Sequence, residues 1–189
     1  FNKIIKELEA TDLKIKYKHA TCSAAVVLYK NSYFNAVRFG IGLYGLHPSE
    51  KTSHKIDLKP ALSWYTKIIQ VKDVPIGTKV GYGCSYITKK PTKIATLPIG
   101  YWDGYDRGFS NNASVIIQGY KCPVIGRISM NLTTVDVSSV KNIEIGDKAI
   151  LIGQSGNKKV SAEELANNIN TINYEIVTRI NPLLPRVVV

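Results

Sequence analysis

The segment Lys93-Ile94-Ala95-Thr96-Leu97 is short, rich in β-branched and apolar residues, and followed by a proline-glycine turn. Similar segments recur between residues 62 and 152, separated by turns such as Pro75-Ile76-Gly77 and Gln118-Gly119-Tyr120. Short segments of this composition, bounded by turn residues, are typical of β-strands. The chain from residue 56 onward is therefore predicted to be mainly β. The remaining strand segments are expected at 62–71, 113–117, 121–125, 133–137 and 148–152.

Helices are expected at the end of this domain. Ser161-Ala162-Glu163-Glu164 is a capping box, which predicts a helix from there through Ile169. A second helix is expected over 174–180, where Asn181-Pro182 ends it, because a proline disfavours helix in the residue before it.

The first quarter of the chain has a different pattern. Residues 2–9 place Ile4, Ile5 and Leu8 on one helix face, 13–17 alternate as a strand does, 24–28 form a short helix, and 36–40 begin a second strand. This order is typical of a parallel α/β unit. We therefore expect two domains, residues 1–55 and 56–189. Because the first helix has no cap residues, it indicates a chain cut from something longer.

Glycines flank two tyrosines of the second domain, in Val80-Gly81-Tyr82-Gly83-Cys84-Ser85-Tyr86 and in Gly100-Tyr101-Trp102-Asp103-Gly104. Glycine weakens a strand, so its presence beside a hydroxyl-bearing side chain favours a site where the backbone approaches a ligand. A tyrosine hydroxyl can donate, accept or transfer a proton. The alternative is that both rings fill a half-buried sheet.

Composition excludes several classes of function. The net charge is +11, but the lysines are scattered and no nucleic-acid-binding motif accompanies them, so we expect no nucleic-acid partner. The apolar runs are too short to cross a bilayer, and no signal peptide is present at Phe1, so we expect a cytoplasmic protein and no membrane contact. Three widely spaced cysteines and three isolated histidines predict neither a disulfide framework nor a metal site.

In the first domain, Ser23 lies at an expected helix start, where its hydroxyl and free backbone amides suit an anion, and Gly40-Ile41 follows a strand end. Plain capping and packing are the alternatives. Arg38 lies between Val37 and Phe39 at the end of a strand expected to be buried, which requires a hydrogen-bond acceptor for its guanidinium. A structural carboxylate is the alternative acceptor.

Five motifs, in order and spacing, resemble those of alanine racemases. They are His19-Ala20-Thr21-Cys22-Ser23-Ala24-Ala25, Val37-Arg38-Phe39-Gly40-Ile41-Gly42-Leu43-Tyr44-Gly45, Gly81-Tyr82-Gly83-Cys84-Ser85-Tyr86, Pro98-Ile99-Gly100-Tyr101-Trp102-Asp103-Gly104 and Gly126-Arg127-Ile128-Ser129-Met130-Asn131. The resemblance implies a β-barrel-like C-terminal domain after a remnant of a (β/α)8 barrel. It covers the later part of the family only, and the lysine that binds pyridoxal 5'-phosphate in the family is absent from this chain.

The resemblance also implies the activity. The protein would be part of an enzyme that interconverts L- and D-alanine and supplies D-alanine for peptidoglycan, and this segment would be inactive alone. Tyr82 would transfer a proton at one face of the substrate Cα, and the missing lysine would serve the other face. Tyr101 would line the path of the substrate, and Met130 would contact its carboxylate through the backbone.

The cofactor residues follow from the same resemblance. Arg38 would face the pyridine nitrogen of pyridoxal phosphate, and His19 would hold Arg38. Ser23, Gly40 and Ile41 would hold the phosphate.

The family forms a head-to-tail homodimer in which the β-domain tyrosine reaches the partner's active site, so the resemblance implies shared sites here. This chain departs from many members at Cys22, where they have Asn, and at Asn131, where they have Asp. It also lacks the tyrosine that some members place near Pro182, so no C-terminal phosphate ligand is expected.

Two readings from other classes remain open. One is a non-catalytic, racemase-like β domain that serves as an interaction or regulatory module. The other is nucleic-acid binding through the basic surface, which predicts strongly salt-dependent retention on DNA. Within the racemase reading, the substrate could be alanine or serine.

Overall fold

The computed structural model describes residues 1–11 and 13–189, and the chain divides into two compact units, Phe1–Ala61 (unit 1) and Leu62–Val189 (unit 2). Unit 1 contains the expected helices at 2–9 and 24–28, which are confirmed, and a further short helix after Pro48 that the sequence did not predict. The helices of unit 1 are α1 (Asn2–Glu9), α2 (Ser23–Leu28) and α3 (Glu50–Ser53), with 3₁₀ helices at Lys30–Ser32 and Ile41–Tyr44.

The strands expected in unit 1 at 13–17 and 36–40 are wrong. Two extended segments lie side by side there, but within the described part of unit 1 their pairing is limited to one parallel bridge between Cys22 and Arg38. The Arg38 N–H donates to the Thr21 carbonyl at 2.9 Å, and the Ala36 N–H donates to the Lys18 carbonyl at 3.2 Å. Parallel strands are stabilised by neighbouring strands and by helices on both faces, and a single bridge supplies neither.

All strand pairs in unit 2 are antiparallel. One sheet has the order β1-β9-β6-β7 with β10 also paired to β9, a second has the order β2-β5-β8, and β3 pairs with β4. The strands are β1 (Trp64–Lys67), β2 (Gln70–Val74), β3 (Lys79–Val80), β4 (Tyr86–Ile87), β5 (Thr92–Leu97), β6 (Ser114–Ile117), β7 (Tyr120–Pro123), β8 (Thr133–Asp136), β9 (Lys148–Ser155) and β10 (Lys158–Val160).

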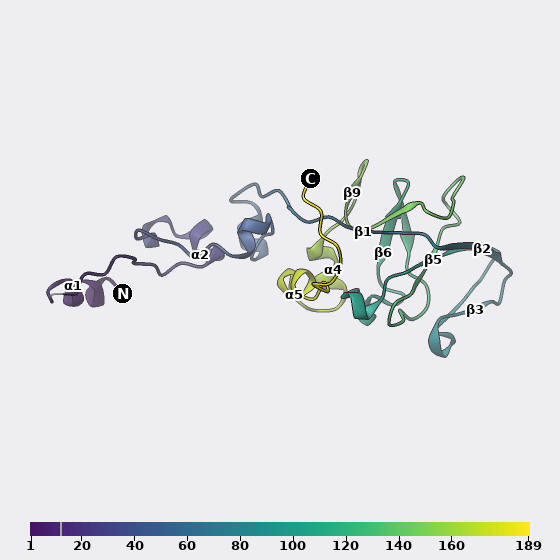
Figure 1. The fold of residues 1–189 in the computed structure, drawn as a ribbon, viewed down its shortest axis with the longest axis horizontal. Helices are drawn as coiled ribbons and strands as arrows, with labels where there is room; N and C mark the ends of the chain where they lie inside the picture. Colours follow the sequence, from purple (N-terminus) through teal and green to yellow (C-terminus); the bar gives the residue numbers. More distant parts are fainter. Residues whose placement is uncertain (12) are drawn as a thin grey trace. The chain divides into compact units, whose positions relative to one another are not determined.

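The two larger sheets join into a barrel-like ring (Figure 1). A bridge between Val124 and Val135 connects the end of β7 to β8, and the Ile125 N–H donates to the Thr134 carbonyl at 2.9 Å. At the other side of the ring, β1 runs directly into β2. Following the pairs from β1 through β9, β6, β7, β8, β5 and β2 therefore leads back to β1, which leaves few free strand edges.

The strand expected over 62–71 is two strands, because the chain changes sheet at Ile68 and Ile69. The Ile68 N–H donates to the Asp147 carbonyl beside β9, and the next N–H, that of Ile69, donates to the Thr96 carbonyl of β5. Ile68 is buried and Ile69 is exposed. The hydrophobic pattern is continuous across this corner, so it conceals the change of partner.

The ring encloses a core of aliphatic side chains, and aromatic rings extend this core toward the C-terminal helices. Tyr105 contacts both Trp64 and Phe109, with ring centroids 5.9 and 5.0 Å apart. The expected helices are confirmed as α4 (Ala162–Asn168) and α5 (Asn173–Thr178). Ser161 caps α4 by accepting the Glu164 N–H at 3.1 Å, and the Glu164 carboxylate pairs with Lys121 at 2.8 Å, which ties α4 to β7.

Candidate functional site

In unit 1, the residues expected to bind phosphate come together around Ser23. Its Oγ accepts the Gly40 N–H at 2.9 Å and lies 3.5 Å from the Gly42 nitrogen. Ser23 and Ile41 are both buried. The N-cap of α2 is Cys22 and Ser23 is the first helical residue, so the alternative in which Ser23 merely caps the helix is wrong. Its hydroxyl oxygen instead lies within hydrogen-bonding distance of two backbone amides, those of Gly40 and Gly42.

Arg38 is exposed, which contradicts the expectation of a buried strand end. One guanidinium nitrogen, Nη2, lies 3.4 Å from the Ala20 carbonyl. Among the described residues, neither a carboxylate nor the imidazole of His19 is its partner; His19 precedes Ala20 on the same extended segment. Beside it, a hydrogen bond from the Ala25 backbone, with smaller contributions that include the charge of Arg38, lowers the pKa of the Cys22 thiol.

In unit 2, Tyr82 begins a 3₁₀ helix, Tyr82–Cys84, in the loop between β3 and β4, and its side chain is 72% exposed. The alternative in which this ring fills a half-buried sheet is wrong, and the backbone explains why. Gly81 has φ 74° and Gly83 has φ 68°, so the chain turns sharply on each side of Tyr82. A Cβ at position 81 would lie 2.4 Å from the Arg127 backbone nitrogen, so this approach requires glycine.

Tyr101 also lies in a 3₁₀ helix, Tyr101–Asp103, and is bound to the segment that carries Met130. Its N–H donates to the Ser129 carbonyl at 3.1 Å, and the Trp102 N–H donates to the Met130 carbonyl at 2.9 Å. Tyr101 and Met130 are both exposed. The turn 126–130 thus contacts the Tyr82 loop through Arg127 and the Tyr101 helix through Ser129 and Met130, so one segment connects the elements that carry the three predicted residues of unit 2.

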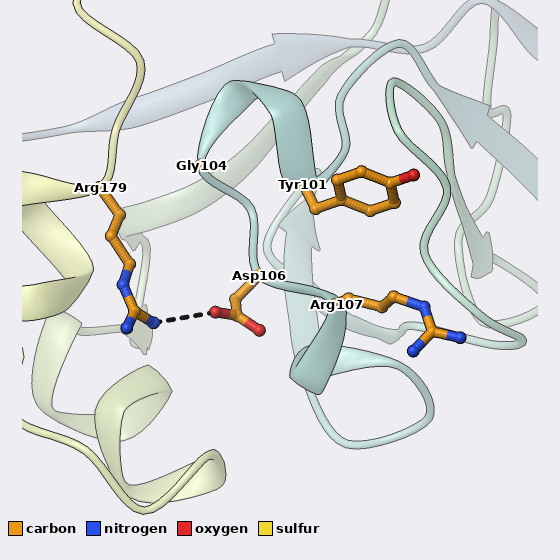
Figure 2. A pocket seen from close by; sticks show the side chains of 5 residues that line it. All are labelled: Tyr101, Gly104, Asp106, Arg107 and Arg179. Atoms are coloured by element: carbon orange, nitrogen blue, oxygen red, sulfur yellow. Dashed lines mark hydrogen bonds and ion pairs between the residues drawn. The ribbon is translucent and has the colours of Figure 1, made fainter.

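A pocket of about 420 Å³ lies beside Tyr101 and is lined by Gly104, Asp106, Arg107 and Arg179 (Figure 2). Arg179, which directly follows α5, pairs with Asp106 at 3.0 Å and with Glu175 at 3.2 Å. A Cβ at Gly104, which has φ 97°, would lie 2.3 Å from the Arg179 carbonyl. The glycine of the Tyr101 motif was therefore a signal for a close backbone approach, but nothing in the sequence indicated that Arg179 was the partner.

The described residues contain no group of three His, Cys, Asp or Glu side chains that could hold a metal ion. No helix among residues 1–11 and 13–189 is both long enough and apolar enough to cross a membrane.

The sequence matches two known domain families in succession. Residues 1–48 match the alanine racemase N-terminal domain, and residues 61–188 match the alanine racemase C-terminal domain. The chain belongs to the alanine racemase family. An alanine racemase from Halothermothrix orenii is 43% identical over 186 residues, which cover 98% of this chain and 49% of that protein.

Solved alanine racemases have the same fold as this family member. The enzyme from Bacillus anthracis with bound L-Ala-P superposes with a TM-score of 0.87 at 36% identity, covering 95% of this chain and 46% of that chain. The Clostridium difficile alanine racemase in complex with cycloserine superposes with a TM-score of 0.89 at 37% identity, covering 95% of this chain and 47% of that chain. The expected fold, a mainly β C-terminal domain after a short piece of the N-terminal domain, is confirmed. The chain spans about half the length of these alanine racemases.

Proposed function

We propose that this chain is the C-terminal part of a pyridoxal-phosphate-dependent racemase that interconverts L- and D-alanine by proton transfer from two faces, and so supplies D-alanine for peptidoglycan. The observation that carries the proposal is the exposed side chain of Tyr82 on a glycine-framed loop whose backbone contacts the segment that leads to Met130, in a domain of this family. We assign residues 1–55 to the end of the cofactor-binding barrel and residues 56–189 to the β domain.

The residues of unit 1 fit the phosphate and ring of pyridoxal phosphate. Ser23 Oγ accepts the N–H groups of Gly40 and Gly42, which leaves the Ser23 O–H as a donor for a phosphate. Arg38 is an exposed cation beside them that can donate to the ring nitrogen but cannot protonate it at neutral pH. Ile41 would present its amide to the phosphate, and His19 would support the segment that Arg38 contacts.

When bound, pyridoxal phosphate supplies an electron sink that makes the substrate Cα–H acidic. Tyr82 would then take or return the Cα proton on one face, as a general acid and base. A lysine from the portion of the family outside this chain would serve the other face. The Met130 carbonyl accepts the Trp102 N–H, so the Met130 amide is the group that would hold the substrate carboxylate. Tyr101 would border the path of the substrate.

A head-to-tail homodimer is the assembly that this function favours. Tyr82, Tyr101, Trp102 and Met130 are each between 44% and 72% exposed, and large apolar and aromatic side chains left exposed favour contact with another surface. In such a dimer each β domain would present Tyr82 to the cofactor of its partner.

The test is racemisation of L- and D-alanine, and of serine, by the full-length gene product with pyridoxal phosphate. Tyr82→Phe removes the hydroxyl alone and is expected to lower kcat by about 10²- to 10⁴-fold in both directions. Tyr120→Phe, an exposed tyrosine of β7, is the matched control and should retain wild-type activity. Intact racemisation in Tyr82→Phe would exclude this role for Tyr82, and no racemisation by wild type would favour the interaction module.

A further inference from the structure

Ser110 and Asn111, which follow the 3₁₀ helix Arg107–Phe109, bind two other segments of unit 2. The Ser110 Oγ accepts the Ile128 N–H at 3.0 Å. The Asn111 Oδ1 accepts the Gly126 N–H at 2.6 Å, and its Nδ2 donates to the Ser85 carbonyl at 3.3 Å. One amide therefore links the turn that leads to Met130 with the loop that carries Tyr82.

The backbone conformation of Asn111 would suit glycine, so the role of this residue lies in its side chain. Asn111 has φ 56°, a left-handed conformation that glycine adopts at lower cost. Asn142 has almost the same backbone, with φ 51°, and there a main-chain carbonyl accepts the hydrogen bond from Gln118. The two asparagines thus share a backbone conformation, while the amide of Asn111 holds two other segments.

The loop and the turn already touch at the other side of Tyr82. The Gly81 backbone packs against the Arg127 nitrogen, and a Cβ at Gly126 would lie 2.8 Å from the Val80 carbonyl. These contacts fix the residues before Tyr82 against the turn. The hydrogen bond from Asn111 to Ser85 fixes the residues after Tyr82. The loop is therefore attached to the turn on both sides of Tyr82, directly through Gly81 and indirectly through Asn111.

We propose that Asn111 is a positioning residue for Tyr82. The side-chain amide of Asn111 sets the placement of the Tyr82 hydroxyl relative to the turn that carries Met130. This inference rests on the proposed function, in which Tyr82 exchanges a proton with the substrate Cα. Proton transfer requires heavy atoms within hydrogen-bonding distance, and a displacement of about 1 Å can lower a rate by about 10²-fold.

Two substitutions in the full-length holoenzyme separate the amide from the backbone. Asn111→Gly keeps the left-handed conformation and removes both hydrogen bonds. Asn111→Asp keeps an acceptor for the Gly126 N–H and removes the donor to Ser85. We expect Asn111→Gly to lower kcat by about 10- to 100-fold with little change in KM, and Asn111→Asp to lower it as well, because the oxygen that replaces Nδ2 would face the Ser85 carbonyl. Asn142→Gly is the matched control and should behave as wild type.

The α-deuterium isotope effect shows where the defect lies. Enantiomers have equal free energies, so the equilibrium constant is one and any variant lowers kcat/KM equally in both directions. Tyr82, however, would abstract the proton from one enantiomer only. A displaced Tyr82 makes that step more rate-limiting, so Asn111→Gly should raise the isotope effect for one enantiomer and not for the other.

Hydrogen exchange measured on the same variants tests the structural part. Asn111→Gly should speed exchange in peptides covering 81–86 and 126–130 and leave β5 and β6 at wild-type rates. Faster exchange throughout unit 2, or an isotope effect that rises for both enantiomers or for neither, would overturn the positioning role. A wild-type enzyme without racemase activity would instead overturn the proposed function, and that outcome is recognised before any Asn111 variant is made.

Discussion

The two units hold their predicted site residues by different means. In the described part of unit 1 the buried apolar side chains are those of Ile41 and Leu46, and α1 buries none. Ser23, Gly40 and Arg38 meet there through a few hydrogen bonds and one parallel bridge. In unit 2, Tyr82 and Tyr101 lie on turns packed against a closed ring of strands with an extensive core.

The two units differ in how much apolar surface they bury, and this determines how easily each opens. Burial of apolar surface is the main favourable term in folding, so a segment with few buried side chains opens at low free energy. Turns attached to the core of unit 2 open only with more of the structure. The geometry around Tyr82 is therefore expected to be stable within unit 2, whereas the geometry around Ser23 is expected to fluctuate in this chain.

The largest expected effect is a difference in alkylation rate between a buried thiol of unit 2 and an exposed thiol of unit 1. Cys122 in β7 is fully buried, and this burial, with a smaller effect of Asp136, raises the pKa of its thiol to about 12. Cys22 in unit 1 is exposed and its pKa is lowered. Because Cys122 reacts only when unit 2 opens, iodoacetamide should label Cys22 at least about 10³-fold faster, as measured by mass spectrometry of the 189-residue chain near neutral pH.

Cys84 is the control within unit 2. It is exposed in the Tyr82 loop and should react readily, which separates burial from membership of a unit. In concentrated urea all three cysteines should react at similar rates. Comparable labelling of Cys122 and Cys22 without denaturant would show that the core of unit 2 opens easily, and the contrast between the units would be lost.

Much of unit 2 could be predicted because its signals are local. The β-branched segments around 93–97 and 148–152 formed strands, and Ser161 capped the helix it was expected to cap. The paired strands β3 and β4 were not predicted, because each has only two residues and so shows no alternation of apolar and polar side chains. In unit 1 the alternation at 13–17 did suggest a strand, but a strand also requires a partner, and the described bridge begins only at Cys22.

Parts of the candidate site could be predicted only where a single residue type indicates a particular backbone conformation. Glycines marked the turns at Tyr82 and Tyr101, since left-handed backbone and close approach both require them. Asn111 and Arg179 gave no such signal, because their roles depend on Ser85, Gly126 and Asp106, which are distant in sequence or unremarkable in type. Arg38 was expected to be buried because its neighbours are apolar, and it is exposed.

A smaller effect is expected from deleting the same side chain in each unit. Leu151 of β9 is fully buried, so Leu151→Ala should lower the free energy of unfolding by about 2–5 kcal/mol. Leu43 of unit 1 is 73% exposed, so Leu43→Ala should change it by less than about 0.5 kcal/mol. Urea denaturation followed by tryptophan fluorescence measures Leu151→Ala, since Trp64 and Trp102 both lie in unit 2, and hydrogen exchange of peptides from unit 1 measures Leu43→Ala. Equal losses in both variants would contradict the contrast.

The smallest effect concerns Glu163 in the first turn of α4. Burial alone would raise the pKa of its carboxyl, but hydrogen bonds from Asn173, its own backbone and Ser161, together with the charge of Lys159, outweigh burial and lower the pKa below its usual 4.5. The Asn173 Nδ2 donates to the carboxylate at 3.0 Å and so links α4 to α5.

The sign of the pH dependence follows from this lowered pKa. As pH falls through about 4.5, the unfolded chain binds a proton at Glu163 before the folded chain does, so the contribution to stability is complete at neutral pH and is lost on acidification. Glu163→Gln should therefore be less stable than wild type by about 1 kcal/mol at neutral pH, and this difference should shrink as the pH falls below 4.5. Glu7→Gln, on exposed α1 of unit 1, should leave the tryptophan-detected curve unchanged at every pH. A difference for Glu163→Gln that stays constant with pH would show that its carboxylate does not stabilise unit 2 through its charge.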